Sequence, residues 1–209
     1  MGLRERKKQQ TRATLIDAAV GLCLKQGYER TTVEQIAAIA EVSPRTFSRY
    51  FATKDAVVMT LIEDVAHAVA AELTRIPLSV PILDAMHRAH VTVLRAAARG
   101  ELPGLTAERI VLMLRIINST PVLKAAATEY RPIATVRALA DRMGTEVADR
   151  KVWMVMSVWS AIIVTACGDL VADDLVAGED GLPVGADLMA SRIDGMYDEF
   201  LVLAGQLTG

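Results

Sequence analysis

One stretch constrains the fold of this chain more than any other: residues 32–54, with the sequence TVEQIAAIAEVSPRTFSRYFATK. Thr32 is suited to cap a helix, and Gln35 three residues later completes a capping box. Thr31 with Glu34 offers the same box one residue earlier. Apolar residues then recur on one face at helical spacing over the next two turns. The stretch is therefore predicted to begin with a short helix.

A second short helix is predicted after a tight turn. Ser43 is a good N-cap, and Pro44 occupies the first helical position, where its missing N–H costs nothing. Phe47 and Phe51 are four residues apart, so they point inward together. The side chains left on the outward face are Arg45, Thr46, Ser48, Arg49 and Tyr50. Two short helices joined by a tight turn have the layout of a helix-turn-helix.

The outward face of this second helix suits a DNA groove. Arginine reaches base edges or phosphates, and the hydroxyls of Ser, Thr and Tyr hydrogen-bond phosphate oxygens. Lys54 opens the next helix behind Thr53, where its charge and the nearby backbone N–H groups favour a phosphate. The alternative is a solvated pair of amphipathic helices inside a larger helical protein.

The residues around the motif also resemble a known family. The run from residue 12 to 58, RATLIDAAVGLCLKQGYERTTVEQIAAIAEVSPRTFSRYFATKDAVV, is similar to the N-terminal domain of TetR-type transcriptional regulators. The resemblance implies that the DNA-contacting positions are Thr32, Arg45, Thr46, Ser48, Arg49, Tyr50 and Lys54, and the cap Ser43 is added to this set. Two residues depart from the family pattern. Glu41 stands where the family often has Gly in the turn, and Ser48 stands where an aromatic residue is usual.

Composition favours an all-α chain of one or two domains. The 209 residues are 52% hydrophobic but only 4% aromatic, and no sustained period-2 alternation indicates strands. Charge is divided unevenly: residues 1–55 carry ten Lys or Arg against six Asp or Glu, whereas the rest carries thirteen against nineteen. A basic front and an acidic rear fit a protein that places one end on a polyanion.

The predicted division has three parts. Residues 1–53 form the helix-turn-helix DNA-binding domain with a basic N-terminal arm, 54–76 the connecting helix, and 77–209 a helical ligand-binding and dimerisation domain. Residues 1–12 hold five basic residues and one acidic residue, which suggests a flexible arm along phosphates or in a minor groove; a solubilising tail is the alternative. A loop rich in Asp and Gly is expected from Asp173 to Gly185.

A ligand pocket is expected in the second domain, where apolar side chains meet a few polar groups. The candidate pocket residues are His90, Met113, Ile117, Tyr130, Trp153 and Met156. Part of this domain is weakly similar to members of the family that respond to acyl ligands, which implies an apolar or amphipathic effector. No HExxH motif occurs, and we predict no enzyme, metal or cofactor, although His87 and His90 together could reach one metal ion.

Two segments near the C-terminus predict a homodimer. Residues 152–168 contain no charge, and a membrane span is the weaker alternative because the run is short for a bilayer. The last helix repeats apolar residues at alternating spacings of four and three, an a/d seam. In TetR-type proteins the last two long helices form the dimer interface. The candidate interface residues are Trp159, Ile163, Met189, Ile193, Met196, Phe200 and Leu203.

Together these features predict a cytoplasmic transcriptional regulator. We expect a repressor that binds a palindromic DNA operator as a homodimer and is released by a small apolar or amphipathic effector. The alternatives are a transcriptional activator and a dimeric ligand- or partner-binding protein with weakened DNA binding. Cys23 and Cys167 lie in apolar surroundings and are expected to be buried, reduced thiols.

Overall fold

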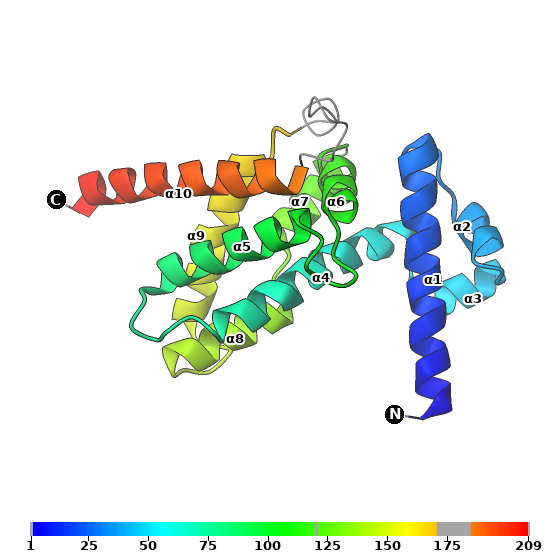
Figure 1. The fold of residues 1–209 in the computed structure, drawn as a ribbon, viewed down its shortest axis with the longest axis horizontal. Helices are drawn as coiled ribbons and strands as arrows, with labels where there is room; N and C mark the ends of the chain where they lie inside the picture. Colours follow the sequence, from blue (N-terminus) through cyan, green and yellow to red (C-terminus); the bar gives the residue numbers. More distant parts are fainter. Residues whose placement is uncertain (1, 120, 171–184, 209) are drawn as a thin grey trace. The chain divides into compact units, whose positions relative to one another are not determined.

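A computed structural model describes residues 2–119, 121–170 and 185–208, and within these ranges the chain contains helices and no strand (Figure 1). The all-α prediction is confirmed. In chain order the helices are α1 (Leu3–Gln26), α2 (Val33–Ile39), α3 (Pro44–Tyr50), α4 (Lys54–Leu73), α5 (Ile82–Ala98), α6 (Ala107–Ser119), α7 (Pro121–Glu129), α8 (Ile133–Met143), α9 (Arg150–Cys167) and α10 (Gly185–Thr208).

The chain divides into two compact units, Met1–Leu61 and Ile62–Gly209. Helix α4 begins in the first unit and ends in the second, so one continuous helix connects them. The assignment of residues 1–53, 54–76 and 77–209 to DNA binding, connection and ligand binding with dimerisation stays a prediction. Each unit has its own buried apolar core.

Local sequence signals set the helices of the first unit as predicted. The Thr32 hydroxyl accepts from the Gln35 backbone N–H at 3.3 Å, while Gln35 Oε1 accepts from the Thr32 N–H at 3.0 Å, so the capping box is formed. Ser43 caps α3 by accepting from the Thr46 N–H at 3.1 Å, with Pro44 at the first helical position. Phe47 is buried, which fixes the inward face of α3.

The turn between α2 and α3 uses a left-handed residue. Glu41 has a φ of 54°, which lies in the left-handed region. Glycine adopts this region without strain, whereas a residue with a side chain does not, and the family often has Gly at this position. Its N–H donates to the Ala38 carbonyl at 3.1 Å, and the Val42 N–H donates to the Ala37 carbonyl at 2.9 Å. These two bonds make a Schellman motif that ends α2 and turns the chain toward α3.

The basic N-terminal segment is helical, whereas one of the two sequence interpretations predicted a flexible arm. Helix α1 begins at Leu3, so the basic residues occupy its first turns. Arg, Lys, Glu and Gln have good helix propensity, and the segment contains no helix-breaking residue after Gly2. Because the later turns of α1 are packed, the exposed turns propagate from a helix that is already nucleated.

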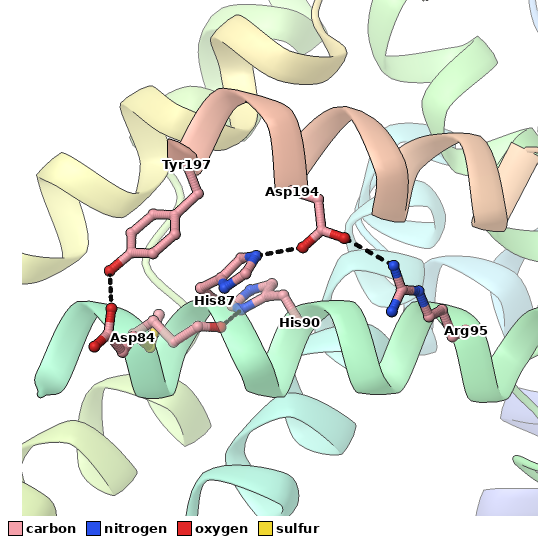
Figure 2. A network of polar contacts seen from close by, with 7 residues as sticks. Asp84, His87, His90, Arg95, Asp194 and Tyr197 are labelled. Atoms are coloured by element: carbon pink, nitrogen blue, oxygen red, sulfur yellow. Dashed lines mark hydrogen bonds and ion pairs between the residues drawn. The ribbon is translucent and has the colours of Figure 1, made fainter. Parts of the chain in front are cut away.

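The second unit is built around α5, α9 and α10. Helix α10 packs most extensively on α5 and next on α9, while α6 and α7 pack on each other. Side chains of α5 and α10 also form a polar network (Figure 2). Asp194 of α10 lies 2.6 Å from His87 Nε2 and accepts from Arg95 Nη2 at 2.7 Å, and the Tyr197 hydroxyl donates to Asp84 at 2.5 Å.

The middle of the second unit follows the sequence prediction with one difference. A proline inside a helical pattern, such as Pro132, predicts a kink in a single helix, but the chain forms two helices, α7 and α8, on either side of it. Proline lacks an N–H and disfavours a helical residue before it, so a break is the stronger outcome of the same physics. Thr120, which with Pro121 is a sequence signal for the start of this segment, lies outside the described residues. The same holds for residues 173–184 of the predicted loop.

Helix α9 is buried on one face and exposed on the other. By length and composition it could cross a membrane, as the sequence alternative noted. Its inward side chains, Val152, Val155, Met156, Trp159, Ile162, Ala166 and Cys167, are buried in the second unit. On the other face Trp153 and Met154 are exposed. This is the pattern of a core helix with an uncovered apolar side, not of a helix buried all round within one subunit.

Candidate functional site

The exposed face of α3 is the first candidate site. Arg45, Ser48 and Arg49 are exposed, and Thr46 and Tyr50 are half-buried. The helix is held from behind by Phe47, whose side chain is 1% exposed, and by Phe51 at its C-cap; the two rings lie 5.7 Å apart. The short helix therefore presents two guanidinium groups and two hydroxyls from a fixed backbone, which is the geometry needed to contact phosphates and base edges.

Two contacts order the polar side chains on this face. The Ser48 hydroxyl donates to the Pro44 carbonyl at 3.1 Å, and the Arg49 guanidinium carbon lies 5.5 Å from the centre of the Tyr50 ring. An arginine held against an aromatic ring loses part of its rotational freedom, so its N–H donors keep a more constant direction. The hydroxyls of Ser43 and Thr46 lie 2.9 Å apart, so both serve the helix cap.

Thr32 and Lys54 have structural partners within the first unit. Thr32 is exposed and caps α2. The Lys54 ammonium donates to the carbonyls of Tyr28 at 3.0 Å and Thr31 at 3.3 Å, and it lies 4.0 Å from the centre of the Tyr28 ring. These bonds use two of its three donors, so Lys54 fixes the loop before α2. The Tyr28 hydroxyl donates to Asp55, which ties the same loop to the start of α4.

A cavity of about 160 Å³ lies inside the second unit and is the second candidate site. Its walls are mainly apolar and rich in methionine. Five of the six residues predicted for a ligand pocket line it: His90, Met113, Ile117, Tyr130 and Met156. The sixth, Trp153, is 42% exposed and does not line the cavity. It lies on the outer face of α9, whereas Trp159 of the same helix takes the place in the wall.

The histidine in the cavity wall is neutral and has two partners. The Trp159 Nε1–H donates to His90 Nε2 at 3.1 Å, so the proton of the imidazole is on Nδ1, which lies 2.8 Å from the Met86 carbonyl. Burial lowers the pKa of His90, the bond to Met86 opposes this and the nearby His87 adds to it, so that the net pKa is about 4. His90 therefore gives the cavity no positive charge at neutral pH.

The other polar groups of the wall lie around α7 and α9. The Tyr130 hydroxyl donates to Glu63 at 2.7 Å, and burial followed by this bond raises its pKa to about 12. Lys124 donates to the Gly168 carbonyl at 2.6 Å, and Ser160 donates to the Thr128 carbonyl at 3.0 Å. Lys124 was missed by the sequence reasoning, because no pattern in α7 distinguishes a cavity lysine from a solvated one.

The cysteines are buried thiols, as predicted. Both Cys23 and Cys167 are free, and burial raises the pKa of each, that of Cys167 to about 12. His87 and His90, which the sequence left as possible ligands of one metal ion, have other partners: His87 pairs with Asp194 and His90 with Trp159. Among the described residues no group of three metal-binding side chains comes together.

The residues predicted for the dimer interface do not share one surface. Trp159, Met189 and Ile193 are at most 5% exposed within their own subunit, so they offer a partner no contact area. The seam of α10 packs on α5 and α9 instead, because an apolar stripe is buried against whichever helix reaches it first. Met196 and Phe200 are half-buried, as is Ile163, which also lines the cavity. Leu203 is exposed, next to Leu201 and Val202.

Comparison with known proteins places both sites in context. Residues 15–59 match the family described as bacterial regulatory proteins, tetR family. The HTH-type transcriptional regulator TcmR of Streptomyces glaucescens is 41% identical over 151 residues, which cover 71% of this chain and 67% of TcmR. The crystal structure of Thermus thermophilus FadR, a TetR family repressor in complex with lauroyl-CoA, covers 89% of this chain and 93% of its own, at 19% identity and a TM-score of 0.50.

The match to TcmR extends well beyond the helix-turn-helix into the second unit, since it covers far more residues than the 45 of the first match. The likeness to FadR shows the fold alone. The helices α2 and α3 with their capped turn, the matching family and the relative TcmR agree with one another. The chain therefore belongs to the TetR family of DNA-binding transcriptional regulators.

Proposed function

We propose that this chain is a cytoplasmic transcriptional repressor that binds a palindromic operator as a homodimer. The observation that carries the proposal is the capped helix α3, which presents Arg45, Ser48 and Arg49 outward from a buried phenylalanine anchor. Each subunit would place α3 in a major groove, with Thr32, Ser43, Thr46, Tyr50 and Lys54 around it. Two-fold symmetry then requires half-sites about 34–36 Å apart, or a multiple of that distance.

The exposed apolar side chains of the second unit support dimer formation. Trp153 and Met154 lie on the outer face of α9, and the last turns of α10 expose Leu201, Val202 and Leu203. Exposed apolar clusters of this kind mark interaction surfaces, because leaving them in water is unfavourable. We propose that a second copy covers them, together with the half-buried faces of the neighbouring residues in α10.

The cavity is the proposed site of a small effector. Its walls are mainly apolar, and His90 is neutral with both nitrogens engaged, which favours a ligand with an apolar body. FadR, which shares the fold, was solved in complex with lauroyl-CoA, and this supports an apolar or amphipathic ligand here. The effector would favour a spacing of the two α3 helices that does not fit successive grooves, and DNA would weaken effector binding to the same degree.

Run-off transcription tests the repressor function. The template is a promoter fragment that the purified protein retains, and the expected result is a transcript that falls as protein is added. Arg45→Ala with Tyr50→Ala is the control, because both side chains lie on the outer face of α3 and their loss leaves the Phe47 anchor in place. A transcript that rises with added protein would identify an activator, and an equal effect of the control variant would overturn the role of α3.

A further inference from the structure

The first turns of α1 carry a row of basic side chains. Arg4, Lys8 and Arg12 follow one another at intervals of four, so they lie along one side of the helix. At roughly 100° per residue, Arg4 and Lys8 fall within about 60° of Leu15 and Ala19 around the axis. Leu15 and Ala19 are buried in the first unit. The basic row therefore continues the side of α1 that faces the rest of the helix-turn-helix unit.

Arg12 fixes this row beside the end of α3. Its Nη2 donates to the Thr60 hydroxyl at 3.3 Å, and its guanidinium carbon lies 5.5 Å from the centre of the Phe51 ring. Phe51 is the C-cap residue of α3. Lys8 and Arg4 follow about 6 Å and 12 Å further along the helix axis, and Figure 1 shows these turns of α1 extending beyond α3.

Arg4 and Lys8, four residues apart, place two like charges side by side on the helix. Like charges four residues apart on a helix repel each other. Arg4, Arg6 and Lys8 are all exposed, but Arg6 points to another side of the helix, about 160° from Lys8 around the axis. A polyanion placed beside the row would turn the repulsion into attraction, and duplex DNA carries one negative charge per about 1.7 Å of its axis.

We propose that Arg4 and Lys8 are a second DNA-contacting element, which binds phosphates of the duplex next to the groove that holds α3. The inference rests on the proposed function of α3. Phosphate contacts carry no sequence information, so the row adds affinity for any duplex and sets the angle at which α3 meets it. A helical row holds its charges at fixed positions, in contrast to a flexible tail.

The test compares the salt dependence of DNA binding for two variants with equal loss of charge. The probe is a mixed-sequence duplex of about 30 base pairs, followed by fluorescence anisotropy between 50 and 200 mM salt. The variant is Arg4→Gln with Lys8→Gln. The matched control is Arg6→Gln with Lys25→Gln, because Arg6 lies on the opposite side of α1 and Lys25 lies in its last turn, about 25 Å from Lys8. All four side chains are exposed, so folding is not at stake.

Two lost phosphate contacts reduce the slope of log K against log [salt] by about 1.8 per bound subunit. We expect this reduction for the Arg4 and Lys8 variant and a slope close to wild type for the control. Equal slopes for the variant and the wild type, or equal reductions in variant and control, would overturn the inference alone. Absence of salt-dependent binding by the wild-type protein would instead overturn the proposed function as well.

Discussion

Because His90 is neutral in the folded chain, it makes the free energy of unfolding depend on pH, and His90→Gln removes this contribution. In the folded chain its pKa is lowered from 6.5 to about 4, chiefly because the imidazole is buried and the charged form would lose its hydration. In the unfolded chain it titrates at its ordinary value. Between these two values the unfolded chain binds a proton that the folded chain does not, so stability falls as the pH falls through this window.

The size of the effect follows from the shift. One pKa unit corresponds to about 1.4 kcal/mol, so the full shift is worth about 3 kcal/mol, reached near pH 4. Between pH 7 and pH 5 the protein loses the part of its free energy of unfolding that corresponds to roughly one and a half pKa units, which is about 2 kcal/mol. At pH 5 ordinary carboxyl groups are still largely ionised, so that interval separates the histidine from acid effects on Asp and Glu.

The assay is urea unfolding at pH 7 and pH 5, followed by circular dichroism at one protein concentration, since dimer formation would make the midpoint depend on it. His90→Gln removes the titrating group and keeps an acceptor for the Trp159 N–H. We expect the wild-type protein to lose about 2 kcal/mol more than this variant between the two pH values. His87→Gln, which removes the neighbouring imidazole, serves as the control and should retain most of the loss.

A result that contradicts the reasoning is an equal loss of stability in the wild-type protein and in His90→Gln. It would mean that the imidazole is hydrated or already charged in the folded protein. The cavity would then offer a polar, protonatable wall, and the apolar ligand proposed for it would lose its main physical support.

Three further predictions concern the turn, the subunit surface and the thiols. Glu41→Gly should raise the free energy of unfolding by about 0.5–1 kcal/mol, because holding a side-chain residue in the left-handed region costs about 1–2 kcal/mol, more than the extra conformational entropy that glycine loses on folding. Glu41→Ala should give no gain in the same urea titration. An equal gain in Glu41→Ala would assign the effect to the charge of Glu41. Val202→Glu with Leu203→Glu should convert a dimer into a monomer in sedimentation equilibrium, whereas a surviving dimer would exclude this surface. Cys23 and Cys167 are buried and have raised pKa values, so they should react with Ellman's reagent at least tenfold faster in urea than in the folded protein. A reaction of the folded protein that is as fast as the reaction in urea would disprove their burial.

The parts of the fold that the sequence predicted well depend on residues close together in the chain. The capping box of Thr32 and Gln35 and the cap at Ser43 act within one helical turn, so their meaning does not change with the rest of the fold. The effect of Pro132 is also local, although a proline in a helical pattern predicts a kink and the chain forms two separate helices there. Thr106, a good capping residue type after Pro103 and Gly104, precedes α6 and accepts from the Arg109 N–H at 3.4 Å.

The residues whose surroundings differ from the sequence expectation depend on which helix packs against which. An a/d seam shows that one side of α10 is buried, but it does not say whether α5 of the same subunit or a second copy covers it. Trp153 and Trp159 are six residues apart, so they face different sides of α9, and only the partners of the helix decide which side is inward. His90 and Trp159 meet across 69 residues of sequence, a distance over which spacing carries no information.

The sequence interpretation of the basic N-terminal segment differs from the structure for another reason. It has no apolar periodicity beyond Leu3, and the absence of a buried face argued for a flexible arm. In the structure its helical propensity prevails, because the segment extends a helix whose later turns are packed. The lesson is that a polar segment with good helix formers can be ordered by its neighbour in sequence.

The most direct test of the central claim is selection of fragmented genomic DNA on the purified protein at about physiological salt, with Arg45→Ala plus Tyr50→Ala as the control. A repressor that reads DNA through α3 predicts enrichment of a palindromic site whose half-sites lie one or two duplex turns apart, and loss of that enrichment in the control. Protein that has been unfolded, freed of bound small molecules and refolded should give the same site. If this stripped protein enriches no site, or if the control enriches the same site as the wild type, the claim that α3 reads an operator is contradicted.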